Sequence, residues 1–80
     1  MASYYRNHDM DDLVTIHVLL LDEGSARPTQ AERAGEGLYR LLPTPSYDLD
    51  DEHWEFLPGS LVRAVTRYYN GKEYLLAVGA

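Results

Sequence analysis

The sequence predicts an all-β fold in the form of a small, strongly bent barrel of five strands. Short runs of β-branched and aromatic residues recur along the chain, and Gly, Pro or Asn-Gly separates each run from the next. After residue 12, no stretch has the 3.6-residue period of a helix longer than a turn or two. The 80 residues leave room for one domain with a small core. We therefore expect a single β-barrel domain over residues 13–80.

Residues 1–12 are predicted to form an arm outside this domain. They are polar, contain the adjacent Tyr4 and Tyr5, and show neither the period of a strand nor that of a helix. Ser3 can cap one helical turn. The alternatives are a mobile arm and a short-helical arm, and in either case the tyrosines can dock on the barrel or on a neighbour.

The first half of the barrel is predicted from local patterns. In the first strand, over residues 13–22, apolar side chains at every second position from Val14 to Leu20 share one face. A weaker strand follows from Arg27 to Ala34, where Pro28 indicates a strand start or a sheet edge. Two glycines then predict a tight hairpin to a third strand over residues 38–42.

The second half begins with a long loop over residues 43–53, which contain two prolines and four acids. A short extended segment around Trp54 leads to a long strand from Leu61 to Tyr69 and a return strand from Glu73 to Val78. Between these strands, Asn70-Gly71 predicts a type I′ turn, because both residues tolerate a positive φ. The predicted core consists of Val14, Ile16, Val18, Leu20, Leu38, Leu41, Trp54, Phe56, Val62, Leu76 and Val78.

The run Trp54-Glu-Phe-Leu-Pro-Gly-Ser-Leu-Val-Arg63, together with Gly37-Leu-Tyr-Arg-Leu41, resembles segments of short bacterial proteins of uncharacterised function. The resemblance extends over residues 13–78 and implies no activity. The order of aromatic pair, Pro-Gly and apolar strand is also similar to the bend of SH3-like barrels. The layout of five strands behind an N-terminal arm is similar to the Sm-like variant, although Arg63-Ala64 stands where Sm-like proteins have an Arg-Gly pair. The resemblance therefore implies an SH3-like or Sm-like barrel and transfers no RNA-contact residue.

The composition excludes several classes of protein. The absence of cysteine removes disulfides and the commonest zinc sites, and it fits a reducing compartment. No apolar stretch, Val18 to Leu21 included, is long enough to span a membrane, and the charges between Arg6 and Asp12 do not have the order of a signal peptide. We expect a soluble, cytoplasmic protein. Its formal net charge of −6 repels nucleic-acid backbones at long range and favours protein partners or none.

No constellation of residues predicts an enzyme or a cofactor site. His17 has no recognisable catalytic partner, and Ser25, Ser46 and Ser60 lie outside any nucleophile motif. The segment Gly35-Glu-Gly37 lacks the following helix that would direct amide groups at a phosphate.

Five carboxylates lie within the eight residues from Asp48 to Glu55, with His53 among them. Their spacing does not match an EF-hand loop, so we interpret the segment as a solvated acidic loop and predict no metal site. A cation site and a docking surface for a basic partner are the alternatives. Tyr47, Asp50 and Asp51 are candidate interaction residues of this loop.

A second candidate surface lies on the strand from Leu61 to Tyr69. Arg63, Arg67 and Tyr69 share one face, because strand side chains alternate. If this face points outward, it forms a strip that suits a carboxylate-bearing partner or single-stranded nucleic acid. In the alternative, the arginines pair with the surplus acids and Tyr69 packs over their stems.

These patterns lead to two hypotheses of function. The first is a non-enzymatic protein-interaction module that self-associates, because a small core without cysteine and unpaired strand edges both favour a partner. The second is a small Sm-like RNA-associated protein that uses the arginine and tyrosine strip.

Overall fold

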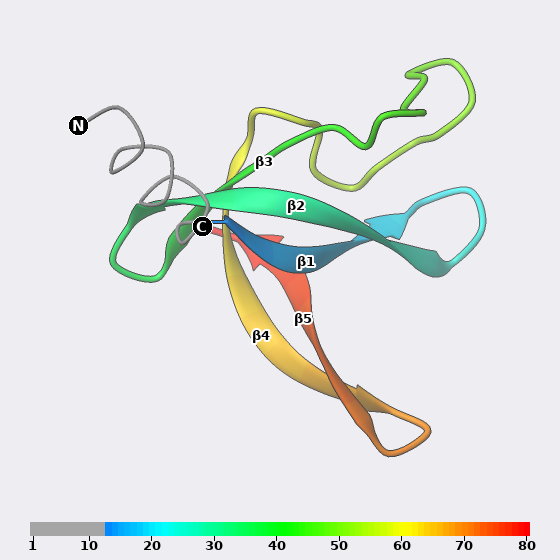
Figure 1. Cartoon of the computed structure of the whole chain (residues 1–80). Helices are drawn as coiled ribbons and strands as arrows, with labels where there is room; N and C mark the ends of the chain where they lie inside the picture. The colour runs from blue at the N-terminus through cyan, green and yellow to red at the C-terminus, as the bar shows by residue number, and fades with distance from the viewer. Residues whose placement is uncertain (1–12) are drawn as a thin grey trace.

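The computed structural model describes residues 13–80, so the arm predicted over residues 1–12, with Ser3, Tyr4 and Tyr5, lies outside the described residues. The fold of the described part is all-β, as predicted, and its five strands form one closed barrel in the order of the chain (Figure 1). No helix in this part is long and apolar enough to cross a membrane. The strands are β1 (Leu13–Leu20), β2 (Ser25–Gly35), β3 (Leu38–Leu41), β4 (Leu61–Tyr69) and β5 (Lys72–Gly79).

β1 forms because its β-branched residues favour an extended backbone, and its alternation decides which face is buried. Ile16 and Val18 are fully buried, whereas Thr15 on the other face is exposed and His17 is half-buried. β1 pairs with β2 along its whole length in antiparallel register. The predicted first strand is confirmed except for its last two residues, 21 and 22, which lie in the turn, and its predicted buried face is confirmed.

β2 begins earlier than predicted, at Ser25, and Pro28 lies within it rather than at its start. β2 has β3 as a neighbour only from Ala31 onward. At Pro28, therefore, one side of the strand has no ladder partner among the described strands. A residue without an N–H is tolerated at such an edge, so the edge alternative is confirmed and the strand-start alternative is wrong.

β3 is short and makes a limited contact with β4. The turn before it contains Gly37, whose φ of +72° favours glycine. Only two register pairs join β3 to β4. Two main-chain hydrogen bonds extend this contact: the Leu41 N–H donates to the Ser60 carbonyl over 3.0 Å, and the Gly59 N–H donates to the Leu41 carbonyl over 2.7 Å.

The β4–β5 hairpin confirms the strongest turn prediction. Asn70 and Gly71 have φ angles of +52° and +79°, which are the signs that a type I′ turn requires. The two strands then pair without interruption from Tyr69 opposite Lys72 to Val62 opposite Gly79. The turn therefore determines the register of the whole hairpin.

The barrel closes between β1 and β5. Five strands in up-and-down order bring β1 and β5 together in the same direction, because each antiparallel step reverses the chain. Their parallel contact consists of one register pair, His17 opposite Leu76. The tips of the β1–β2 and β4–β5 hairpins diverge from this contact, as Figure 1 shows. The layout is consistent with the SH3-like and Sm-like barrels that the sequence resembles.

The core lies inside the barrel and is small. Thr29 is its buried polar residue, and the Thr29 hydroxyl donates a hydrogen bond to the Leu42 carbonyl over 2.6 Å. Val14 and Phe56, both predicted core residues, are half-buried and pack against the cluster. The buried cluster consists of Ile16, Val18, Leu20, Ala31, Leu41, Trp54, Val62 and Ala77.

The predicted core assignment is wrong for three residues, which are half-buried outside the cluster: Leu38, Leu76 and Val78. In β5 the neighbouring Leu75 and Ala77 face the core instead. The cause is the register, because the inward Ala64 of β4 stands opposite Ala77, and opposed residues share a face.

Leu41→Ala is expected to destabilise the barrel severely. Leu41 is fully buried, and truncation of a buried leucine costs about 2–5 kcal/mol of a total stability of roughly 5–15 kcal/mol. Urea unfolding should show a much lower midpoint or no folded baseline. The matched control is Leu61→Ala, because Leu61 is 44% exposed and should change the midpoint little. Equal losses in the two variants would contradict the described interior.

Candidate interaction surface

The outer face of β4 carries three of the predicted site residues. Val62 is fully buried and Ala64 packs against the core, so these two residues point inward. Because strand side chains alternate, Arg63, Arg67 and Tyr69 point outward. All three are exposed, and Tyr69 keeps 72% of its surface accessible. The orientation that the sequence left open is therefore the outward one.

β5 widens this strip into a two-stranded face. The register places one β5 residue beside each outward residue of β4, and opposed residues point to the same side of a sheet. We use the term basic face for the residues Arg63, Val65, Arg67 and Tyr69 of β4 with Lys72, Tyr74, Leu76 and Val78 of β5.

The basic face contains no carboxylate, although the whole chain carries a net charge of −6. Three of the seven Lys and Arg residues of the chain lie on it. Among residues 13–80, no Asp or Glu forms an ion pair with Arg63, Arg67 or Lys72. The pairing of these arginines with surplus acids, which was the alternative from the sequence, does not occur within the described residues.

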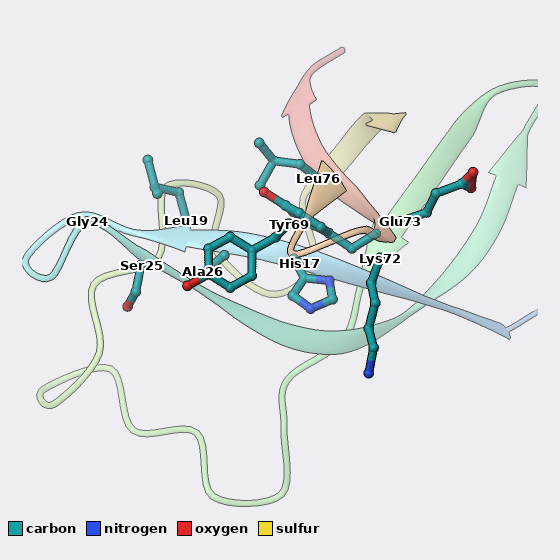
Figure 2. A pocket seen from close by; sticks show the side chains of 10 residues that line it. His17, Leu19, Gly24, Ser25, Ala26, Tyr69, Lys72, Glu73 and Leu76 are labelled. Carbon is teal, nitrogen blue, oxygen red and sulfur yellow. The ribbon is translucent and has the colours of Figure 1, made fainter. Parts of the chain in front are cut away.

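A groove of about 690 Å³ lies between the β1–β2 hairpin and the β4–β5 hairpin (Figure 2). It opens where β1 and β5 diverge from their single register pair. The acid among its lining residues is Glu73, whose carboxylate accepts a hydrogen bond from the Tyr68 hydroxyl over 3.4 Å. The groove is lined by His17, Leu19, Gly24, Ser25, Ala26, Tyr69, Lys72, Glu73, Tyr74 and Leu76.

His17 lies at the closed end of this groove, in the β1–β5 register pair. Its ring packs edge to face against Tyr74, with ring centroids 4.9 Å apart and planes at 63°. Within the described part of the chain, the buried Nδ1 of His17 has no hydrogen-bond partner. The imidazole is therefore held by aromatic packing rather than by a carboxylate.

The outer half of the β4–β5 hairpin has no neighbouring strand among the described residues. β3 reaches β4 only at Leu61 and Val62, and β1 reaches β5 only at Leu76. A two-stranded ribbon without neighbours is only marginally stable. It also presents open main-chain edges. Tyr68, on the side opposite to Tyr69, keeps 69% of its surface accessible, so this ribbon has open edges and exposed aromatic side chains on both sides.

The acidic loop connects β3 to β4, and one of its acids organises a compact turn. The Asp48 carboxylate accepts a hydrogen bond from the Asp50 N–H over 2.9 Å. The Asp48 carbonyl accepts two more, from the N–H groups of Asp51 and Glu52. The turn over residues 48–52 is therefore held by its own backbone and by one carboxylate.

Glu52 and Trp54 attach this loop to the barrel. The Glu52 carboxylate accepts hydrogen bonds from Trp54 Nε1 over 2.8 Å and from Arg27 Nε over 3.0 Å. A β-bridge joins Trp54 to Leu20 at the end of β1. Tyr47 packs edge to face on Trp54, with centroids 4.8 Å apart, and is half-buried. Tyr47, a predicted interaction residue, thus contributes mainly to packing in this structure.

Asp50 and Asp51 remain exposed at the surface of the loop, beside Leu49, which keeps 55% of its surface accessible. Neither carboxylate has an ion-pair partner among residues 13–80. His53 pairs with Asp22, and the described part of the chain contains no group of three His, Asp or Glu side chains placed to hold a metal ion. The β1–β2 hairpin lies between this loop and the β4–β5 hairpin (Figure 1). The structure therefore separates Asp50 and Asp51 from the three candidates on the basic face.

Sequence reasoning missed the β5 and β1 sides of the groove. The sequence contained a signal for the β5 side. A two-residue Asn70-Gly71 turn sets Tyr69 opposite Lys72, and this pair fixes all the other residue pairs between β4 and β5. For His17 and Leu19 no local signal existed, since their position depends on barrel closure more than 50 residues later in the chain.

Comparisons of the chain with protein-family models, with curated proteins and with solved structures found no match.

Glu52→Ala is expected to lower the free energy of unfolding by about 1–3 kcal/mol, because the buried indole N–H of Trp54 loses its acceptor. Asp51→Ala, one residue earlier, removes an exposed carboxylate and should stay within about 0.5 kcal/mol of the parent chain. Urea unfolding followed by the fluorescence of Trp54, the single tryptophan, measures both. If the two variants prove equally stable, Glu52 does not anchor the loop.

Proposed function

We propose that the chain is a non-enzymatic protein-interaction module whose binding surface is the basic face with its groove. One observation carries the proposal. A chain of net charge −6 presents three cations, two tyrosines and aliphatic side chains on one sheet face, with no ion-paired acid among the described residues. Arginine and tyrosine are among the residues most enriched at the energetic centres of protein interfaces. A partner that carries carboxylates and apolar side chains suits this face.

The groove supports binding better than catalysis. Its imidazole, His17, packs on Tyr74 and lacks a hydrogen-bond partner at Nδ1 within residues 13–80. A general base or an activated nucleophile requires an orienting partner of that kind. The proposed module needs no cofactor.

We place this function in the bacterial cytoplasm. The composition without cysteine suits a reducing compartment. The segments around Trp54 and Gly37 resemble those of short bacterial proteins, and the barrel layout supports an SH3-like or Sm-like variant.

A small Sm-like RNA-associated protein is the second candidate function. The exposed Tyr69 next to Arg67 and Lys72 favours it, because bases stack on exposed aromatic rings and cations contact phosphates. The net charge of −6 opposes it, since counterion release needs more clustered cations than this chain has. The protein-interaction function therefore ranks first.

Arg67→Glu and Tyr69→Ala are each expected to abolish the capture of protein partners in a pull-down from nuclease-treated bacterial lysate at two salt concentrations. Each change removes an exposed side chain of the basic face without touching the core. Partners that survive nuclease and salt in the parent chain, and are absent with both variants, support the module.

Two matched controls accompany this pull-down. Arg33→Glu makes the same charge change at an exposed position of β2, and Tyr68→Ala removes a tyrosine of nearly equal exposure from the opposite side of the hairpin, 69% against 72%. Both controls should retain the partners. Equal losses with controls and face variants would show that the basic face is not the binding surface.

The RNA candidate predicts that a labelled single-stranded RNA binds the chain at low salt and dissociates as salt rises. Arg63→Ala or Arg67→Ala should weaken binding and reduce the slope of log K against log salt by about one. Fluorescence anisotropy measures both quantities. Absence of binding at low salt would eliminate this candidate.

A further inference from the structure

We infer that the groove beside the basic face docks the acidic loop of a second copy of this chain, so that the protein self-associates head to tail. The inference rests on the proposed function and names the partner of that same surface. The docking element is the turn over residues 48–52. Asp50 and Asp51 are its charged contacts and Leu49 is its apolar contact.

The groove offers an apolar floor with cations beside it. Leu19 of β1 and Leu76 of β5 contribute aliphatic side chains from the two diverging hairpins (Figure 2). Lys72 lines the groove, and Arg67 stands opposite the lining residue Tyr74. The acid that also lines the groove, Glu73, accepts a hydrogen bond from the Tyr68 hydroxyl. An occupant that combines carboxylates with an aliphatic side chain therefore suits this lining.

The acidic loop has this combination on its surface. Asp50 and Asp51 are exposed and, among residues 13–80, have no ion-pair partner. Leu49 is 55% exposed directly beside them. The bonds to Asp48 hold the turn in one shape before docking, which lowers the entropy lost on association.

The loop does not reach the groove of its own chain. The Glu55 N–H donates to the Leu19 carbonyl over 2.8 Å, and Glu52 pairs with Arg27, so the loop is held at the end of the β1–β2 hairpin. None of the residues from 43 to 60 lines the groove. A second copy brings the same loop to the groove without detaching it from its own barrel.

The negative net charge of each copy does not prevent this contact. At physiological ionic strength, charges are screened beyond a distance of about 8 Å. Repulsion between whole copies is therefore weakened, whereas contacts between Asp50 or Asp51 and the cations of the groove act at shorter range.

The contact is heterologous, because it joins two different surfaces of the chain. After one docking event, one copy still has an unoccupied groove and the other an unoccupied loop, so further copies can add. Reversing the charges of the groove or of the loop tests the two surfaces separately.

Two variants of the full chain test the inference by sedimentation velocity. The face-reversed variant carries Arg67→Glu and Lys72→Glu, and the loop-reversed variant carries Asp50→Lys and Asp51→Lys. The parent chain is expected to associate at tens of micromolar. Each variant alone should associate at least about tenfold more weakly. An equimolar mixture should regain the association of the parent chain, because the loop of each variant is opposite in charge to the groove of the other.

The mixture also shows that both variants are folded, since each must supply an intact surface. The variant with all four changes should regain association, because both charges of the contact are reversed together. The matched control, Glu32→Lys with Glu36→Lys, makes the same charge change at exposed positions outside the loop and should associate as the parent chain does.

Several results would overturn the inference. They are a monomeric parent chain at these concentrations, association of either variant alone at the parent level, and a mixture that stays monomeric while the parent associates. If the parent chain is monomeric, the self-association inference fails, and the pull-down still tests the proposed function. Loss of partners with Tyr69→Ala but not with Tyr68→Ala would show that the basic face binds another protein.

Discussion

The odd number of strands in the barrel is the constraint on which the rest of the surface depends. An up-and-down barrel of five strands must close with a parallel contact, and here that contact is one register pair, His17 opposite Leu76. With an even number, the first and last strands would run antiparallel, as in the other pairs of this barrel. Because the closure is so short, the two hairpins diverge from it (Figure 1). The groove and the unsupported ribbon beyond β4 and β5 are both consequences of that divergence.

Trp54 anchors the long acidic loop to the small core. Its ring fills the barrel interior beside Leu20, and its indole N–H donates to Glu52, which also accepts from Arg27. One carboxylate thus satisfies a buried donor and a half-buried cation, and the loop acquires a fixed position at the end of β1. The acids of this loop look equivalent in the sequence, but the structure divides them. Glu52 maintains the fold, whereas Asp50 is exposed to solvent.

The sequence predicted all five strands because their signals are local: alternation in β1, glycines before β3 and Asn70-Gly71 before β5. It failed on the buried face of β5, where Leu75 to Val78 form a continuous apolar run with no alternation to read. That face is decided by pairing, because Ala64 points inward and stands opposite Ala77. The strip on β4 was visible from its period of two. Its orientation and the groove beside it were not, because both depend on contacts between distant strands.

The net charge of a chain does not show which surface binds, because it sums charges that the fold places on different surfaces. The sum of −6 describes the long-range field of the chain, which salt weakens beyond about 8 Å. At contact distance the arrangement matters instead, and the fold collects three cations with Tyr69 on one face while it holds Asp50 and Asp51 beyond the β1–β2 hairpin. Attraction within one chain would have neutralised both surfaces. Because the barrel holds them apart, each surface keeps its charge. In the proposed function a partner covers the exposed Tyr69, which adds nothing to the core.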